Sequence, residues 1–266
     1  MRVDEHNVMT TVSATAALRS CLSALRQRRL SSGPNDLIWS YLNHADTRLA
    51  DLRQRLQTNT FHFNPVEQIR LRDGQWVSRY EPEDQVVIAR MKQVLEPLCQ
   101  RYLDLTQASH LTGHGGMKGA VSKARRLAER NTYVFKTDIA DFYESINHRM
   151  MQGKMNRVVT DKRLRRLVWD SMERVHVCAG NYRHITKKGI SRGCSLSPLM
   201  GAVYLTPLDA YAKANKLDYV RFMDDILFFA TTRHKLKKII REVYPILNRL
   251  ELRLAKDKTW IGRVTK

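Results

Sequence analysis

An acidic pair interrupts a strand-like apolar stretch of this chain. Residues 220–229 read Val-Arg-Phe-Met-Asp-Asp-Ile-Leu-Phe-Phe, a run that is typical of a buried strand apart from Asp224 and Asp225. An unpaired carboxylate is costly to bury, so a cation must compensate it, and a divalent metal ion does this well. Successive strand residues point to opposite faces, so both carboxylates reach one ion only from a tight turn. The run therefore predicts a hairpin with the acidic pair at its tip, open to substrate.

A third carboxylate lies in a similar setting far upstream. Asp138 comes at the end of a strand predicted over residues 133–139, far enough from Asp224 for helices to intervene before an adjacent strand. Taken alone, Asp138 would more often be a turn residue, and a lone Asp-Asp pair a surface turn. The three carboxylates together, in apolar flanks on a basic chain, favour a two-metal phosphoryl-transfer site.

The charge of the chain narrows the class of partner. Of its 266 residues, 46 are Lys or Arg and 26 are Asp or Glu, which gives a net charge of +20. Such a field attracts polyanions, and nucleic acid is the commonest of these; the alternative is a basic solvated surface without a partner. No long apolar run and no signal-peptide pattern occurs, so we expect a cytoplasmic protein with no membrane partner.

The four cysteines form no C-x-x-C pair, as expected of reduced thiols. His176, Cys178 and His184 lie close together in sequence, which suggests a metal site. However, no fourth ligand at zinc-like spacing accompanies them. A zinc site is therefore the lesser alternative.

Apolar periodicity outlines the secondary structure. Residues 69–80 contain two alternating runs around Asp73-Gly74, which predicts a β-hairpin, whereas the glycine-rich residues 113–119 favour an ordinary loop. The alternation of strands and helices indicates an α/β or α+β sheet with helices on one face. Helices are predicted over residues 11–30, 36–57, 83–103 (with a kink or break at Pro97), 164–175 and 232–250, and from Ser197-Pro198 through Leu208.

Four motifs follow one another along the chain: residues 138–143, residues 189–199 with a glycine followed by Ser-Pro, residues 222–225 (x-x-Asp-Asp), and residues 252–262, which include Lys258 to Gly262. They resemble, in this order, the first palm motif, the glycine-then-Ser-Pro motif, the x-x-Asp-Asp motif and the lysine motif of bacterial reverse transcriptases of the group II intron-like, retron-like and defence-associated types. The hairpin that carries Arg72 and Arg79 is also similar to their fingers hairpin, and the resemblance covers about residues 36–262. It implies an α+β right-hand polymerase fold, with fingers and an antiparallel palm sheet backed by helices.

The resemblance also implies a domain organisation. We expect an N-terminal helical extension over residues 1–60, fingers over 61–132 and a palm over 133–266. A fingers-like helical insertion is expected within the palm, near residues 150–185. The helical thumb that follows in the family is expected beyond residue 266.

The implied activity is that of an RNA-directed DNA polymerase, which adds deoxynucleotides to a primer 3′-hydroxyl by two-metal-ion phosphoryl transfer. Two Mg²⁺ ions, with Mn²⁺ as a substitute, would be held by Asp138, Asp224, Asp225 and the Ile139 carbonyl. Lys258 matches the lysine that protonates leaving pyrophosphate in the family, although a surface lysine is the plainer interpretation.

The resemblance assigns a nucleotide site as well. Asp141 and Phe142 would offer backbone amides to the triphosphate. Tyr143 occupies the position of a bulky ring that excludes a ribose 2′-hydroxyl, but without the motif it would be taken as a core aromatic.

Three arginines and a glycine complete the implied nucleotide site. Arg72 and Arg79 would contact phosphate oxygens bidentately, or else be solvated hairpin charges. Arg192 stands before Gly193 where many relatives carry Gln, and it would add a phosphate or base contact.

The implied partners are an RNA template, a DNA or RNA primer, deoxynucleoside triphosphates and a dedicated non-coding or intron RNA. One alternative is a non-catalytic, maturase-like RNA-binding protein, against which the three retained acids argue. Another is template-independent or antiphage defence-associated DNA synthesis, and because the same palm serves all of these uses the residues do not separate them.

Overall fold

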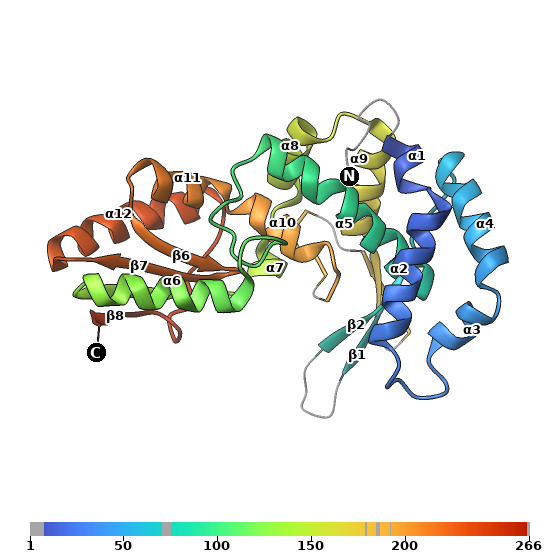
Figure 1. Ribbon diagram of the computed structural model, residues 1–266, viewed down its shortest axis with the longest axis horizontal. Helices are drawn as coiled ribbons and strands as arrows, with labels where there is room; N and C mark the ends of the chain where they lie inside the picture. Colours follow the sequence, from blue (N-terminus) through green and yellow to red (C-terminus); the bar gives the residue numbers. More distant parts are fainter. Residues whose placement is uncertain (1–7, 71–75, 179, 185–186, 192, 265–266) are drawn as a thin grey trace. The chain divides into compact units, whose positions relative to one another are not determined.

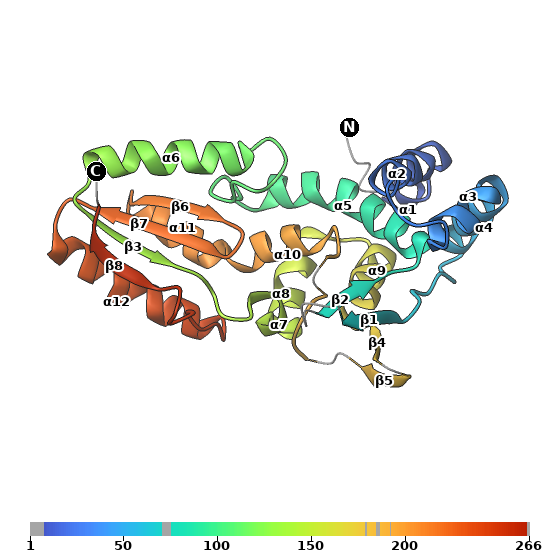
Figure 2. The same cartoon turned by 90° about the horizontal axis from the view of Figure 1, so that it is seen from below.

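The computed structural model describes residues 8–70, 76–178, 180–184, 187–191 and 193–264 (Figures 1 and 2). The chain divides into two compact units, and each is assembled from two separate stretches. Unit 1 comprises Met1–Leu98 and Met155–Ser197, and unit 2 comprises Cys99–Lys154 and Pro198–Lys266. Each unit contains its own four-stranded sheet, so the predicted α+β class is confirmed.

The described part of unit 1 begins with four short helices. Each of the two long helices predicted over residues 11–30 and 36–57 is divided into two. The apolar spacing continues through residues 11–30, yet Ala14 is extended (φ −59°, ψ 118°). Likewise His44 (φ −123°, ψ 29°) ends one helix and precedes the next within residues 36–57. Single non-helical residues do not disturb a 3.6-residue pattern, so periodicity alone misses them. The helices are α1 (Val8–Val12), α2 (Thr15–Arg28), α3 (Leu37–Asn43) and α4 (Ala45–Gln57).

The sheet of unit 1 contains the predicted hairpin. Strand β1 (Val66–Arg70) pairs antiparallel with β2 (Trp76–Arg79), and its other edge pairs in parallel with β4 (Val175–Cys178). Strand β4 in turn pairs antiparallel with β5 (Asn181–His184), which gives the order β2-β1-β4-β5. Residues 71–75, which include Arg72, lie outside the described residues.

Two longer helices complete unit 1. Helix α5 (Pro82–Tyr102) continues through Pro97, so of the kink or break expected there, the break does not occur. Helix α9 (Lys162–Met172) is followed by β4, so Val175, predicted as helical, is the first residue of a strand.

A buried ion pair connects these two helical regions. The Arg174 guanidinium lies 3.3 Å from the Asp84 carboxylate, and both side chains are almost fully buried. Burial raises the pKa of Asp84 to about 6, although Arg174 opposes the shift. Arg174 also lies 4.2 Å from the ring centroid of Phe63, which adds a cation–π contact. The pair holds the first turn of α5 to the segment between α9 and β4.

The sheet of unit 2 is antiparallel throughout, as predicted. Its strands are ordered β6-β7-β3-β8, and β7 pairs with both β6 and β3. The strands are β3 (Tyr133–Thr137), β6 (Asp218–Phe222), β7 (Asp225–Ala230) and β8 (Trp260–Arg263).

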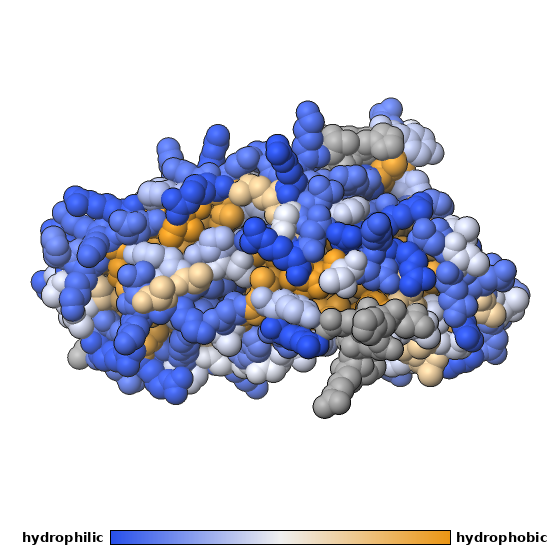
Figure 3. Space-filling model, turned by 90° about the horizontal axis from the view of Figure 1, so that it is seen from above, coloured by the Kyte–Doolittle hydropathy of each residue, from blue (hydrophilic) through white to orange (hydrophobic). Residues whose placement is uncertain are grey.

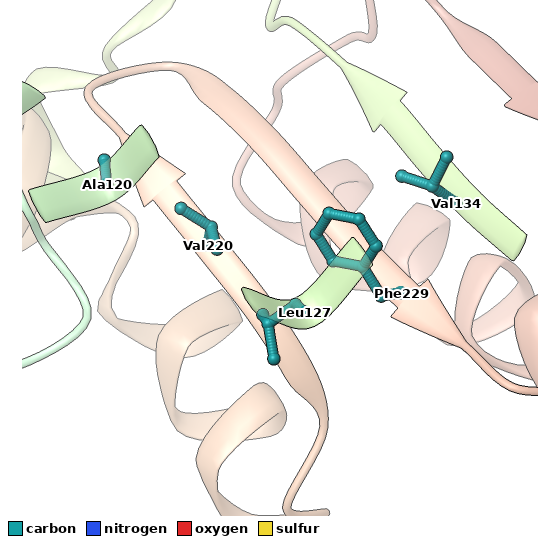
Figure 4. Packing of buried hydrophobic residues seen from close by; sticks show 5 residues of the cluster. All are labelled: Ala120, Leu127, Val134, Val220 and Phe229. Carbon is teal, nitrogen blue, oxygen red and sulfur yellow. The ribbon is translucent and has the colours of Figure 1, made fainter. Parts of the chain in front are cut away.

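Helices cover both faces of this sheet rather than the one face predicted. Helix α6 (Gly116–Arg130) packs on one face, and α12 (Arg233–Arg249) contacts β7 and β3 from the other. Figure 4 shows the apolar contact beneath α6, in which Ala120 and Leu127 meet the strand residues Val134, Val220 and Phe229. Helix α6 was missed because it begins inside the glycine-rich stretch, directly after Gly115 in the left-handed region (φ 89°).

Shorter helices connect the strands of unit 2. Pro198 lies in the first turn of α10 (Ser197–Tyr204), and this helix ends before Leu205, so the helix predicted through Leu208 is again two helices. Thr232 caps α12 by accepting a hydrogen bond from the Lys235 amide at 3.2 Å. The remaining helices are α7 (Phe142–Ser145), α8 (His148–Val158) and α11 (Thr206–Ala214).

Hydrophilic residues cover most of the surface displayed in Figure 3, in keeping with the net charge of +20. No helix among the described residues is long and apolar enough to cross a membrane.

Close packing in unit 2 requires a glycine at one helical position. A Cβ atom added to Gly201 in α10 would lie 2.8 Å from Cε1 of the buried Phe142. We therefore expect Gly201→Ala to destabilise the protein by about 1–2 kcal/mol, because the ring must move out of a packed position. The midpoint and slope of urea unfolding measure this change.

Gly153 in α8 supplies the matched control. A Cβ atom there meets nothing within 4 Å, so Gly153→Ala should stabilise the protein by about 0.5–1 kcal/mol through helix propensity alone. Stabilisation by both substitutions would contradict the packing argument.

Candidate active site

The acidic pair lies at the tip of a tight hairpin, as predicted. Phe222 pairs with Asp225, so only Met223 and Asp224 form the turn between β6 and β7. Met223 adopts a positive φ of 54°, a value that two-residue hairpin turns of the primed types require at their first position. Asp225 is the first residue of β7 and is exposed.

The third carboxylate joins them through strand pairing. Asp138 directly follows β3, whose last residue, Thr137, pairs with Ile226 of β7. Asp138 is buried, and its Oδ1 atom has no hydrogen-bond partner. The sheet thus places the end of β3 beside the beginning of β7, which brings together acids that are far apart in sequence.

Asp138 lies close enough to Asp224 and Asp225 to affect the pKa of both. Burial, and then the neighbouring Asp138 carboxylate, raises the pKa of Asp224 to about 6. Partial loss of solvation at the carboxylate and the charge of Asp138 also raise the pKa of Asp225, although its residue is exposed, with Lys136 and Lys258 opposing the shift. Negative charge in this cluster is therefore under-compensated by the protein.

Lys258 is the cation nearest to Asp138. Its Nζ atom donates to Asp138 Oδ2 at 2.5 Å, and this carboxylate raises the pKa of the lysine. The lysine side chain is 63% exposed, so its ammonium group approaches the buried acid from solvent. Lys258 is thus a predicted site residue whose pairing with Asp138 has no signal in the sequence.

The donor chemistry suits a hard divalent cation. Carboxylate oxygens are preferred ligands of such ions, and one of them, Asp138 Oδ1, is buried without a partner. In the described part of the chain, no three His, Cys, Asp or Glu side chains form a ready-made metal site. The acids thus have the donor atoms that a metal ion needs. Because Lys258 is bound to the other oxygen of Asp138, the acidic side chains would have to reorient to share one ion.

Backbone hydrogen bonds hold the chain on both sides of Ile139. The Ala255 amide donates to the Asp138 carbonyl at 2.9 Å, and the Ala140 amide donates to the Arg253 carbonyl at 2.8 Å. The segment before β8 therefore fixes the backbone at the end of β3.

A histidine that sequence analysis did not single out holds the acidic turn. The Met223 amide donates to His110 Nδ1 at 3.0 Å, so the ring proton resides on Nε2, which donates to the Pro198 carbonyl at 3.0 Å. Burial lowers the pKa of His110 to about 4, which keeps the ring neutral. No local pattern distinguishes this histidine, because both of its partners are remote in sequence.

The other side of the turn is held by a fully buried arginine. Arg221 Nη1 donates to the Met223 carbonyl at 3.1 Å, and Nε donates to Asp209 Oδ1 at 2.9 Å. Tyr219 donates its hydroxyl to the same Asp209 oxygen at 2.9 Å. The sequence does contain a signal for this contact, an arginine inside an apolar, strand-like run. Such a buried charge needs a buried partner.

The residues after Asp138 form a short helix. Asp141 lies in the left-handed region (φ 45°, ψ 45°) directly before α7 and is exposed. Phe142 is buried, whereas Tyr143 is partly exposed, and the two ring centroids lie 5.2 Å apart. Roles for these three residues in nucleotide binding stay predictions.

Two of the remaining predicted site residues, Arg79 and Gly193, lie in the described part of unit 1. Arg79 forms an ion pair with Glu67 of the neighbouring strand, and both side chains are about half exposed. Gly193 is exposed and has a positive φ of 81°. Arg72 and Arg192 are outside the described residues, so their predicted contacts stay predictions.

The histidine considered for zinc has other partners. His176 Nδ1 is hydrogen-bonded to Gln68 at 2.8 Å, and its Nε2 to Ser191 at 3.0 Å. Both ring nitrogens are thus used within unit 1.

The family of the chain is established by comparison with known proteins. A family model described as reverse transcriptase (RNA-dependent DNA polymerase) matches residues 48–265, which is most of the chain. The chain therefore belongs to the reverse transcriptase family.

Two curated relatives are similar to it. Protein YkfC of Escherichia coli is 25% identical over 170 residues, which cover 51% of this chain and 44% of YkfC. The putative COX1/OXI3 intron 2 protein of Saccharomyces cerevisiae is 23% identical over 198 residues, which cover 73% of this chain and 23% of that protein. The chain thus spans less than half the length of each relative.

Solved structures share the fold at low identity. Apo telomerase from Candida tropicalis, truncated from its C-terminal domain, aligns with a TM-score of 0.57 at 12% identity, over 75% of this chain and 50% of that one. A partial Cas6-RT-Cas1–Cas2 complex aligns with a TM-score of 0.55 at 12% identity, over 91% of this chain and 42% of that one. With the family match, these likenesses confirm the predicted fingers-and-palm polymerase fold.

The role of His110 can be tested on the acidic turn itself. We expect His110→Gln to accelerate hydrogen exchange of the Met223 amide about fivefold, because the longer amide group replaces Nε2 but not the acceptor Nδ1. His110→Asn should retain most of the protection, since its side-chain oxygen takes the place of Nδ1. Exchange followed by mass spectrometry on a peptide that contains the turn measures both. Equal protection in the two variants would show that His110 does not hold Met223.

Proposed function

We propose that this protein is an RNA-directed DNA polymerase that adds deoxynucleotides to a primer 3′-hydroxyl by two-metal-ion phosphoryl transfer. The observation that carries the proposal is the arrangement of Asp138, Asp224 and Asp225 at one end of the unit 2 sheet, in a chain of the reverse transcriptase family. Under-compensated carboxylates around a partnerless buried oxygen favour a cation-dependent chemistry over a purely structural role.

The three carboxylates and the Ile139 carbonyl would hold two Mg²⁺ ions, or Mn²⁺ in their place. When bound, the ions would activate the primer hydroxyl and neutralise charge on the triphosphate. Lys258 would move from Asp138 to the leaving pyrophosphate. A lysine ammonium group is protonated at neutral pH, so a proton would be available for the leaving group.

Other residues would position the nucleotide. The backbone amides of Asp141 and Phe142 would contact the triphosphate, and the partly exposed ring of Tyr143 would lie under the sugar. Arg72, Arg79, Arg192 and Gly193 of unit 1 would bind phosphate or template, in which case Arg79 would exchange Glu67 for a phosphate oxygen.

The sheet of unit 2 would then be the palm, within the proposed range 133–266. The fingers would occupy residues 61–132 and follow a helical extension over residues 1–60. The fingers-like helical insertion would lie within the palm range, near residues 150–185. These proposed domain boundaries differ from those of the two compact units, of which unit 1 ends at Leu98, resumes at Met155 and ends again at Ser197.

The expected partners are an RNA template, a DNA or RNA primer and deoxynucleoside triphosphates, in the cytoplasm. The net charge of +20 supports nucleic-acid binding. The similarity to an intron 2 protein favours, in addition, a dedicated intron or other non-coding RNA. It also supports the second candidate function, a maturase-like protein that binds RNA without catalysis. Defence-associated or template-independent synthesis would use the same acids.

A primer-extension assay separates catalysis from binding alone. We expect the full-length protein to extend a primer on an RNA template with Mg²⁺ and deoxynucleotides. Asp224→Asn combined with Asp225→Asn should lower the rate at least about a hundredfold, because metal stabilisation of the transition state is worth several kcal/mol.

The same double variant has a readout that is independent of activity. Without metal, removal of the mutual repulsion should stabilise the protein by about 1 kcal/mol, which raises the melting temperature by about 2–4 °C. Mg²⁺ should then stabilise the native protein but not the variant. Binding of RNA without extension and without a Mg²⁺ shift would support the non-catalytic alternative instead.

The role of Tyr143 predicts a change in sugar selection. Tyr143→Ala should raise the incorporation of ribonucleotides relative to deoxynucleotides, because the ring no longer obstructs a 2′-hydroxyl. Tyr143→Phe keeps the ring and should keep the native ratio. Competitive single-nucleotide incorporation measures the ratio, and an unchanged value in Tyr143→Ala would remove this role.

A further inference from the structure

A basic groove lies on the α12 face of the unit 2 sheet, away from the carboxylates. It has a volume of about 770 Å³ and lies between α12 and the edge strand β8, both visible in Figure 2. Four cationic side chains line it, Arg233, Lys237, Arg241 and Arg263, and no acidic residue is among the described residues that do so.

Three of the cations form a regular row. Arg233, Lys237 and Arg241 are four residues apart along α12, so they follow one another on one side of the helix at intervals of about 6 Å. All three are exposed, and within the described ranges none of them forms an ion pair with a carboxylate. The row therefore presents uncompensated positive charge along the whole groove.

The opposite wall provides an aromatic and aliphatic surface. Tyr133 of β3 pairs with Arg263 of β8, and their side chains lie on the same face of the sheet as α12. The Arg263 guanidinium lies 5.8 Å from the Tyr133 ring centroid. Ile261, which is 54% exposed, extends this wall. An aromatic ring and an exposed aliphatic side chain thus lie opposite a line of cations.

We propose that this groove binds a single-stranded segment of nucleic acid at a site separate from the catalytic carboxylates. The α12 row would contact successive phosphates, and a base would stack on Tyr133 or pack on Ile261. Tyr133 and Asp138 are five residues apart, on and just beyond β3, which corresponds to roughly 16 Å of extended chain. A nucleic-acid strand bound in the groove would therefore leave the acidic end of the sheet free.

The shape of the groove favours a single strand of nucleic acid over other anions. A free phosphate would need only one or two of the cations, whereas the row extends over two turns of α12. An anionic membrane requires a flat or protruding surface, whereas these cations line a groove beside an edge strand. The chemistry recognised here is a phosphodiester backbone with accessible bases.

Charge reversal on α12 tests the proposal. The probe is a fluorescent oligouridylate, and its binding to the full-length protein is measured by anisotropy over a salt series. Arg233→Glu with Lys237→Glu should weaken binding at least about tenfold and reduce the salt slope by about 0.7 for each lost phosphate contact. Lys235→Glu with Lys238→Glu makes the same change in net charge on exposed α12 residues that do not line the groove, and it should behave like the native protein.

A second measurement locates the strand. Photo-crosslinking of a 4-thiouridine oligonucleotide should label the peptides that contain Tyr133 or Ile261, and Arg263→Gln should reduce this labelling. Both effects should persist in the Asp224→Asn, Asp225→Asn background, so their outcome is independent of whether the protein polymerises DNA. Equal losses in the two α12 variants, labelling elsewhere only, or binding of anionic vesicles in place of RNA would overturn the proposal.

Discussion

The buried contact between Arg221 and Asp209 supports much of unit 2. Arg221 of β6 is fully buried, and Asp209 of α11 is almost fully buried. Water therefore stabilises neither charge. Removing one member of such a pair typically costs about 3–5 kcal/mol, since the other is then left uncompensated. Because Arg221 also donates to the Met223 carbonyl, the same interaction that fixes β6 against α11 also fixes the acidic turn. The geometry of the candidate site is in this sense a consequence of core electrostatics.

The acidic cluster itself works against stability. Three carboxylates lie at one end of the sheet, burial raises the pKa of Asp224, and the cation nearest to Asp138 is the largely exposed Lys258. Sites that must hold charged ligands commonly carry such unfavourable interactions, which the surrounding structure offsets. Here that surrounding structure is the pairing of β3 with β7 and the pair of contacts, from His110 and Arg221, on either side of Met223.

The sequence predicts the site better than it predicts what supports the site. Asp138, Asp224 and Asp225 are conspicuous because acids in apolar strands are costly, and the hairpin at residues 69–80 because turn chemistry is local. His110, by contrast, acquires its role only from partners that are remote in the chain, and α6 begins among glycines that locally favour a loop. The breaks at Ala14 and His44 depend on one residue each, which periodic patterns do not resolve.

The pairing of β1 with β4 has a consequence for how the protein is made. These two strands are parallel neighbours, yet a long stretch of chain lies between them, including the first part of unit 2. Because synthesis proceeds from the N-terminus, β1 is made well before β4. In the same way, β3, in the first part of unit 2, is made before its neighbours β7 and β8 and before β6. Long-range pairings of this kind close slowly, because the entropy of a large loop is lost before the contacts form. During synthesis the early strands thus keep unpaired edges until the later strands have been made.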